Sequence, residues 1–184
     1  MLLGRREGNI IKAKAIAGQN TSSCGVRPAY REEWDDAMAL AWRTFMRFEA
    51  GDYTQEGIKS FQDFITDSVL HRMFLMGAYQ LFVAQERGRI VGMISLRNET
   101  HISLLFVDAA YHKRGIGRKL IEYVSDYVRN EEGYRRITVN AAPYAVGFYH
   151  KLNFRDTQEE QTSDGIRYTP VSYTHLTLPT ILRV

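Results

Sequence analysis

Residues 104–120 read LLFVDAAYHKRGIGRKL, which is an apolar run, then a polar loop with two glycines, then the start of an amphipathic pattern. The first turn of a helix leaves backbone N–H groups unpaired, and the helix dipole favours an anion there. Gly115 and Gly117 present no side chain that would block a phosphate group. Four basic residues surround them: Lys113, Arg114, Arg118 and Lys119. The stretch fits a pyrophosphate cradle, and it fits a solvated basic turn equally well.

Two common phosphate-binding loops are excluded by the residues that follow the glycines. A P-loop continues with Lys and then Ser or Thr, whereas Gly117 is followed by Arg118 and Lys119. A dinucleotide-binding loop has a third glycine where Leu120 stands. A phosphate ligand of this loop would therefore be held by another type of motif.

The elements around this loop define a fold class. Most of the chain shows one of two patterns. In some segments apolar residues recur at helical spacing, and other short segments are enriched in β-branched and aromatic residues, which is typical of strands. We expect helices over 30–48, 58–65, 69–76, 116–128 and 143–152, with Asp52 or Thr54 capping the second. We expect strands at 26–28, 79–85, 90–96, 101–107, 137–139, 154–157 and 166–168, the last two forming a hairpin around Asp164-Gly165. This order predicts a mixed α/β (α+β) fold, with a mostly antiparallel, twisted sheet of about six to seven strands and helices on both faces.

Length and composition are typical of one globular domain. The chain has 184 residues, of which 45% are hydrophobic and 24% charged. We predict a flexible leader at residues 1–25, a domain at 26–170 and an atypical tail at 171–184. The net charge of +3 comes from the ends, because residues 26–170 hold 19 basic and 20 acidic residues. This balance disfavours nucleic-acid binding.

The single cysteine, Cys24, excludes an internal disulfide and a multi-cysteine zinc site. The histidines are scattered without metal-ligand spacing, so we expect no catalytic metal. No apolar run is long enough to span a membrane, and no signal peptide is evident. We therefore expect a cytoplasmic protein without a membrane partner.

Together with a second motif downstream, the loop resembles the GNAT superfamily of acetyl-CoA-dependent N-acetyltransferases. The family motif Gln/Arg-x-x-Gly-x-Gly/Ala corresponds to residues 112–117, with His112 in the first place. The family's strand, short helix and FYxKLGF ending correspond to 137–154, where Asn153 replaces the usual glycine. Asn tolerates the left-handed conformation needed at a helix C-terminus. The resemblance covers residues 26–168.

The resemblance implies specific roles for residues. The pyrophosphate of acetyl-CoA would lie on the loop that contains His112, Lys113, Arg114, Gly115, Ile116, Gly117 and Arg118. Backbone groups of Phe106 and Val107 would bind the acetyl and pantetheine part. Asn140 follows a strand, a position that fits an Asn holding a water or a cofactor amide and fits a turn-forming Asn equally well. Tyr149 would be the general acid for the departing thiolate, although its spacing also fits simple packing in an amphipathic helix.

The function implied is transfer of an acetyl group to a primary amine by direct attack, with a small molecule or peptide as acceptor. Four residues could act as general base, namely Glu49, Asp52, Glu99 and His101, and the sequence selects none. Aromatic residues of the first two helices are mostly core, and one or two could line the acceptor pocket. The alternative is a GNAT-like module that binds acyl-CoA without turnover. A homodimer is compatible with either.

Overall fold

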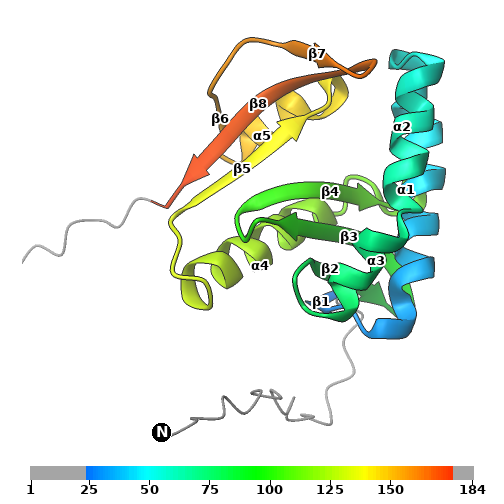
Figure 1. Cartoon of the computed structure of the whole chain (residues 1–184). Coiled ribbons are helices and arrows are strands. Elements are labelled where there is room, and N and C mark those ends of the chain that lie inside the picture. The colour runs from blue at the N-terminus through cyan, green and yellow to red at the C-terminus, as the bar shows by residue number, and fades with distance from the viewer. Residues whose placement is uncertain (1–23, 176–184) are drawn as a thin grey trace, which may run out of the picture.

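The computed structural model describes residues 24–175 and consists of one sheet with helices against both of its faces (Figure 1). The expected leader therefore lies outside the described residues, apart from Cys24 and Gly25. The helices are α1 (Trp34–Phe48), α2 (Gln55–Ile65), α3 (Ser68–Leu75), α4 (Ile116–Asn130) and α5 (Val146–Lys151). Within the described part of the chain, no helix has the length and apolar character to span a membrane.

The strands are β1 (Gly25–Pro28), β2 (Gln80–Glu86), β3 (Arg89–Arg97), β4 (His101–Val107), β5 (Arg136–Ala141), β6 (Arg155–Asp156), β7 (Gln161–Ser163) and β8 (Ile166–Thr174). They form an eight-stranded sheet in the order β1-β2-β3-β4-β5-β8-β6, with β7 paired to β8. All pairs are antiparallel except β4 with β5. The predicted fold class is confirmed, and the strands expected at 79–85, 90–96 and 101–107 form the antiparallel meander β2-β3-β4.

Local sequence explains where the first helices begin. α1 buries the face that contains Trp34, Met38, Ala41 and Phe45. Thr54 caps α2, since its hydroxyl accepts a hydrogen bond from the Gly57 amide, and Asp67 caps α3 in the same way. Residues 31–33, which were expected in the first helix, form a short 3₁₀ turn instead.

Two hydrophobic clusters, one on each face of the sheet, hold the layers together. The first joins α1, α2 and α3 to the face of β2, β3 and β4 that carries Val83, Met93 and Phe106. The second joins α4 and α5 to the opposite face and includes Leu120, Val124 and Tyr149. The sheet is therefore buried on both sides, as the sequence pattern predicts.

The last strands differ from the prediction in two respects. The hairpin around Asp164-Gly165 exists, but its strands are β7 and β8, whereas β6 pairs with the far end of β8. β7 escaped the sequence analysis because Gln161–Ser163 is short and polar. β8 runs on to Thr174 and buries Val171, so residues 171–174 belong to the sheet and not to the predicted tail.

A β-bulge bends β4 close to its only contact with β5. Ser95 pairs with Leu104 and Leu96 with Ile102, so Ser103 has no partner residue on β3. Bulges bend the strand that carries the extra residue. The parallel pairing of β4 with β5 is limited to two residue pairs, His101 with Thr138 and Ile102 with Val139. Beyond Ile102 the two strands separate (Figure 1).

The turn between β7 and β8 packs directly against the first turn of α2. A Cβ atom added at Gly57 would lie 2.5 Å from the carbonyl oxygen of Gly165. Gly165 itself has a φ of +75°, and the Thr54 hydroxyl occupies the space of its missing side chain. Glycine at both positions is thus required for this close approach.

We predict that Gly57→Ala lowers the free energy of unfolding by about 1–3 kcal/mol, because backbone must move to admit the methyl group. Thermal and urea unfolding would measure the change. Gly51→Ala is the matched control, since a Cβ at Gly51 meets nothing within 4 Å, and its effect should stay within about 0.5 kcal/mol. Equal stability of the two variants would contradict the packing described.

Candidate active site

The separation of β4 from β5 opens a pocket of about 500 Å³. β4 contributes residues 101–106 to its wall, and β5 with the following residues contributes 139–142. Of the residues predicted for the site, Phe106, Asn140 and Tyr149 line it. The remaining wall comes from α1, α2 and the β7–β8 hairpin. Elements from both halves of the chain therefore meet around one space.

Tyr149 is a buried tyrosine of α5 whose side chain lines this pocket. Its ring packs against Phe148 and Phe154, with centroids 5.2 Å away in each case. Burial, and then the nearby Glu49 carboxylate, raise the pKa of Tyr149 above its ordinary value of 10.0. The phenol therefore carries its proton at neutral pH and can donate it. The ring thus packs within the hydrophobic cluster, and the residue also forms part of the pocket wall.

Glu49 lies where α1 ends, and it also lines the pocket. Burial, and then the neighbouring Asp52 carboxylate, raise its pKa to about 7. Its charge also influences Tyr53, Tyr144 and Tyr149, which places it close to all three phenols. A carboxylate that titrates near neutrality is suited to accept a proton from a reacting group.

The other candidates for general base are less suitable. His101 lines the pocket, but burial, and then the charge of Arg97, lower its pKa to about 4, so it is neutral and a weak base. Its Nδ1 shares a hydrogen bond of 2.8 Å with the Thr138 hydroxyl. Asp52 and Glu99 are exposed and are not part of the pocket wall. The structure thus distinguishes Glu49 among four residues that the sequence left equivalent.

The glycine-containing loop lies between β4 and α4, outside the pocket itself. Gly115 precedes the helix in a left-handed conformation, with φ of +76°, and a Cβ there would meet nothing within 4 Å. The first residues of α4 are Ile116, Gly117 and Arg118, whose amides belong to the turn that has no helical acceptors. This open helix N-terminus suits an anion such as a pyrophosphate.

Several side chains fix the loop in place. Asp108 accepts a hydrogen bond from the Ala110 amide at 3.0 Å and forms an ion pair with Arg43 at 3.0 Å. His112 Nε2 donates to the Val107 carbonyl oxygen at 2.8 Å. His112, which departs from the family motif, thus ties the loop to the end of β4. Its ring also lies against Phe48, 4.7 Å between centroids, which brings the end of α1 beside the loop.

The structure shows further contacts for two of the residues predicted to bind the pyrophosphate, Arg114 and Gly117, and an exposed side chain for a third, Lys113. Arg114 forms an ion pair of 2.7 Å with the buried Glu86, so its charge also holds the loop against β2. A Cβ at Gly117 would lie 3.1 Å from the Phe148 ring, so this glycine serves packing as well as access. Lys113 is exposed, with φ of +59°.

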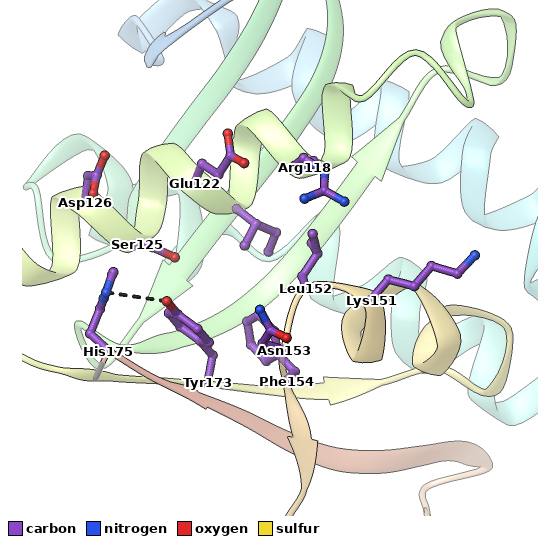
Figure 2. A pocket seen from close by; sticks show the side chains of 11 residues that line it. Arg118, Glu122, Ser125, Asp126, Lys151, Leu152, Asn153, Phe154, Tyr173 and His175 are labelled. Atoms are coloured by element: carbon purple, nitrogen blue, oxygen red, sulfur yellow. Dashed lines mark hydrogen bonds between the residues drawn. The ribbon is translucent and has the colours of Figure 1, made fainter. Parts of the chain in front are cut away.

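Arg118 has its amide in the first turn of α4, while its side chain lines a second pocket of about 360 Å³. Figure 2 shows this pocket between α4, α5 and β8, with the side chain of Arg118 pointing toward Leu152. Glu122 and Asp126 continue the wall along α4, and Tyr173 and His175 close it from β8 and the residue after it. Residues 173 and 175 lie in the segment that the sequence analysis assigned to the tail.

Metal binding gains no support from this arrangement. Among residues 24–175, no three His, Cys, Asp or Glu side chains gather into a group that could hold an ion.

Comparison with known proteins identifies the protein family. Residues 49–175 match the acetyltransferase (GNAT) domain. Glucosamine 6-phosphate N-acetyltransferase of Trypanosoma brucei brucei is 30% identical in an alignment of 95 residues. The match covers 46% of this chain and 64% of that protein, just under two thirds of its length.

Two solved structures share the fold. A GCN5-related N-acetyltransferase from Rhodopseudomonas palustris superimposes with a TM-score of 0.72, at 23% identity over 86% of this chain and 100% of the other. The PaiA N-acetyltransferase of Thermoplasma acidophilum, solved with coenzyme A, gives 0.70 at 17% identity over 83% and 99%.

The chain therefore belongs to the GNAT acetyltransferase family. This membership confirms the resemblance drawn from residues 112–117 and 137–154.

We predict that Gly115→Glu weakens acetyl-CoA binding about tenfold or more, because the new carboxylate would stand before the anion-binding turn of α4. Calorimetric titration with acetyl-CoA, with desulfo-CoA and ATP as comparison ligands, would measure it. Gly133→Glu is the matched control: Gly133 also has a positive φ, +73°, and open space around it, but it lies beyond the far end of α4. Equal affinity of the two variants would contradict the cradle.

Proposed function

We propose that the protein transfers an acetyl group from acetyl-CoA to a primary amine by direct attack within a ternary complex. The observation that carries the proposal is the separation of β4 from β5 beside the open N-terminus of α4. Acetyl-CoA supplies the acetyl group activated as a thioester. It combines an anionic pyrophosphate with an extended, amide-containing arm, and the two features of the site suit these two parts.

The edge of β4 supports binding of the extended arm. From Ser103 to Val107, β4 has no pairing with β5, so its backbone N–H and C=O groups on that side have no strand partner. An extended chain with amide groups can pair with such an edge. Phe106 and Val107 are the last residues of this edge, and the loop anchored by His112 follows them. The arm and the pyrophosphate would thus be bound by consecutive segments, with Asn140 on the facing wall.

Tyr149 has the properties of the general acid. The amine nitrogen forms the C–N bond while the C–S bond breaks, one proton leaves the nitrogen, and one proton must reach the sulfur. Tyr149 keeps its proton because burial and Glu49 raise its pKa, and it stands in the pocket wall. The protonated phenol can therefore donate a hydrogen bond to the departing thiolate, and in this proposal its proton passes to the sulfur as the C–S bond breaks.

The position of Cys24 supports direct attack over an acyl-enzyme. Cys24 packs against the hydrophobic cluster under α4, and it is not among the residues that line the pocket. Burial raises the pKa of its thiol, which disfavours the nucleophilic thiolate. Holding the two reactants next to each other would supply much of the rate.

The comparisons support a primary amine as the acceptor class. The T. brucei relative is named as acting on glucosamine 6-phosphate, and a Vibrio cholerae protein of the same fold is named a spermidine N-acetyltransferase. Both acceptors are small amines of very different charge.

We predict that Tyr149→Phe lowers kcat about 100-fold while the Kd for acetyl-CoA changes less than about twofold, because only the proton donor is lost and the ring remains. Thiol release from acetyl-CoA over a panel of amines and calorimetry would give the two values. Tyr123→Phe, a half-buried tyrosine of α4 outside the pocket, is the control. An equal loss of turnover and affinity would show that the hydroxyl only binds. Acetyl-CoA binding without consumption by any amine would favour the binding module.

A further inference from the structure

The pocket wall on the acceptor side is mainly aromatic. Phe45 is buried, and its ring lies 4.0 Å from Phe61 and 5.3 Å from Tyr53, between centroids. Phe61 in turn contacts Phe106 of β4 at 5.7 Å. Phe64 also lines the pocket and is half-buried. The rings come from α1, α2 and the segment between them, so they form one continuous apolar surface that faces the split between β4 and β5.

Few charges interrupt this surface. Among the described residues that line the pocket, Glu49 and Asp164 are the carboxylates and Arg97 the permanent cation. Arg97 is opposite His101 in the β3–β4 register, at the end of β4 that is remote from the glycine-containing loop. Asp164 is exposed in the β7–β8 turn and accepts a hydrogen bond from Ser163. Glu49 is the carboxylate that is shielded from solvent.

Glu49 stands at the end of the pocket where transfer would occur. Its chain neighbour Phe48 packs against His112 of the loop and, with centroids 6.0 Å apart, against Tyr144. Its charge acts on Tyr149 in α5. An amine nitrogen beside Glu49 is therefore also near the proposed proton donor, and the rest of the amine then extends over the aromatic wall.

We propose that the acceptor is a primary amine with an apolar, preferably aromatic, body, and that Glu49 receives its nitrogen and removes its proton. This inference rests on the proposed acetyl transfer. The ammonium group binds the carboxylate and gives it one proton, and the free amine then attacks the thioester carbonyl. As the C–S bond breaks, Tyr149 protonates the sulfur, and the second proton leaves the nitrogen and restores the Tyr149 phenol. Glu49 afterwards releases its proton to solvent. For a phosphorylated acceptor, the pocket offers one permanent cation, Arg97, at the end remote from the loop before α4. For a polyamine, the pocket's second carboxylate, Asp164, is exposed to water and would add little to binding.

The groups that face Glu49 define its titration. Burial, and then the Asp52 carboxylate, raise the pKa of Glu49. The other groups beside it, Tyr53, Tyr144 and Tyr149, are uncharged phenols near neutral pH. Arg167 of β8 acts on Tyr53. Activity therefore rises as pH increases through about 7, where Glu49 loses its proton. The pKa of Glu49 is about 7 in the folded chain and 4.5 without burial. Its contribution to the free energy of unfolding is therefore fully present below pH 4.5 and is lost as the pH rises through about 7.

The first experiment compares acceptors with the full chain and acetyl-CoA, following thiol release. The probes are 2-phenylethylamine and hexylamine against ethanolamine, glucosamine 6-phosphate and spermidine. We expect kcat/KM for 2-phenylethylamine to exceed that of the three polar amines by about 100-fold, from burial of its ring. Preference for glucosamine 6-phosphate or spermidine would overturn the inference while leaving acetyl transfer intact. Acetyl-CoA binding with no turnover of any amine would overturn both, as would absence of binding.

The second experiment tests the two parts of the proposed acceptor site separately. Phe64→Ser should lower kcat/KM for 2-phenylethylamine about tenfold more than it lowers kcat/KM for ethanolamine, because the substrate ring loses an apolar neighbour. Met46→Ser is the control, because Met46 is an exposed residue of α1 outside the pocket. Equal effects of Phe64→Ser on both amines would contradict an apolar contact with the substrate.

Glu49→Gln should lower kcat/KM about 100-fold or more at pH 8 and abolish the acidic limb of the pH profile near 7. Asp52→Asn is the matched variant: it should move that limb to lower pH and leave activity at pH 9 unchanged. Glu49→Gln should also raise the melting temperature at pH 8, since a buried charge is removed. An unchanged pH profile in Glu49→Gln would overturn the assignment of Glu49 as base.

Discussion

The separation of β4 from β5 after two residue pairs is the feature on which the rest of the site depends. Ser103 has no partner on β3, and a strand with such an extra residue bends away from its neighbour. The separation opens the pocket inside the sheet and leaves one edge of β4 without a partner strand. If β4 and β5 remained paired beyond Ile102 and Val139, the space between them would close and leave no room for a ligand.

Rigid surroundings keep this opening in shape. The loop after β4 is fixed at three points, by Asp108, by His112 and by the ion pair of Arg114 with Glu86. On the acceptor side, the contact of Gly57 with Gly165 holds α2 against the β7–β8 turn. The site is thus prepared before any ligand arrives, which reduces the ordering that binding requires.

Sequence patterns predicted the elements of the fold well, because helix periodicity, capping and strand composition are local properties. The positions of three features agree with the prediction: the glycine-containing loop between β4 and α4, the helix cap at Thr54 and the limits of β4. β7 was missed because its three residues are polar, and β8 was cut short because its last residues do not resemble the family. The bulge at Ser103 was invisible, since it depends on how β3 and β4 pair. The choice of Glu49 among four acids and bases needed the burial that only the folded chain supplies.

The most direct test of the central claim is hydrogen exchange of the backbone amides with and without acetyl-CoA. If β4 offers its free edge and α4 its N-terminal turn, acetyl-CoA slows exchange at residues 103–107 and 115–118 together, while β1 and β2 are unaffected. Protection confined to other segments, or protection of the loop without the β4 edge, would contradict the account.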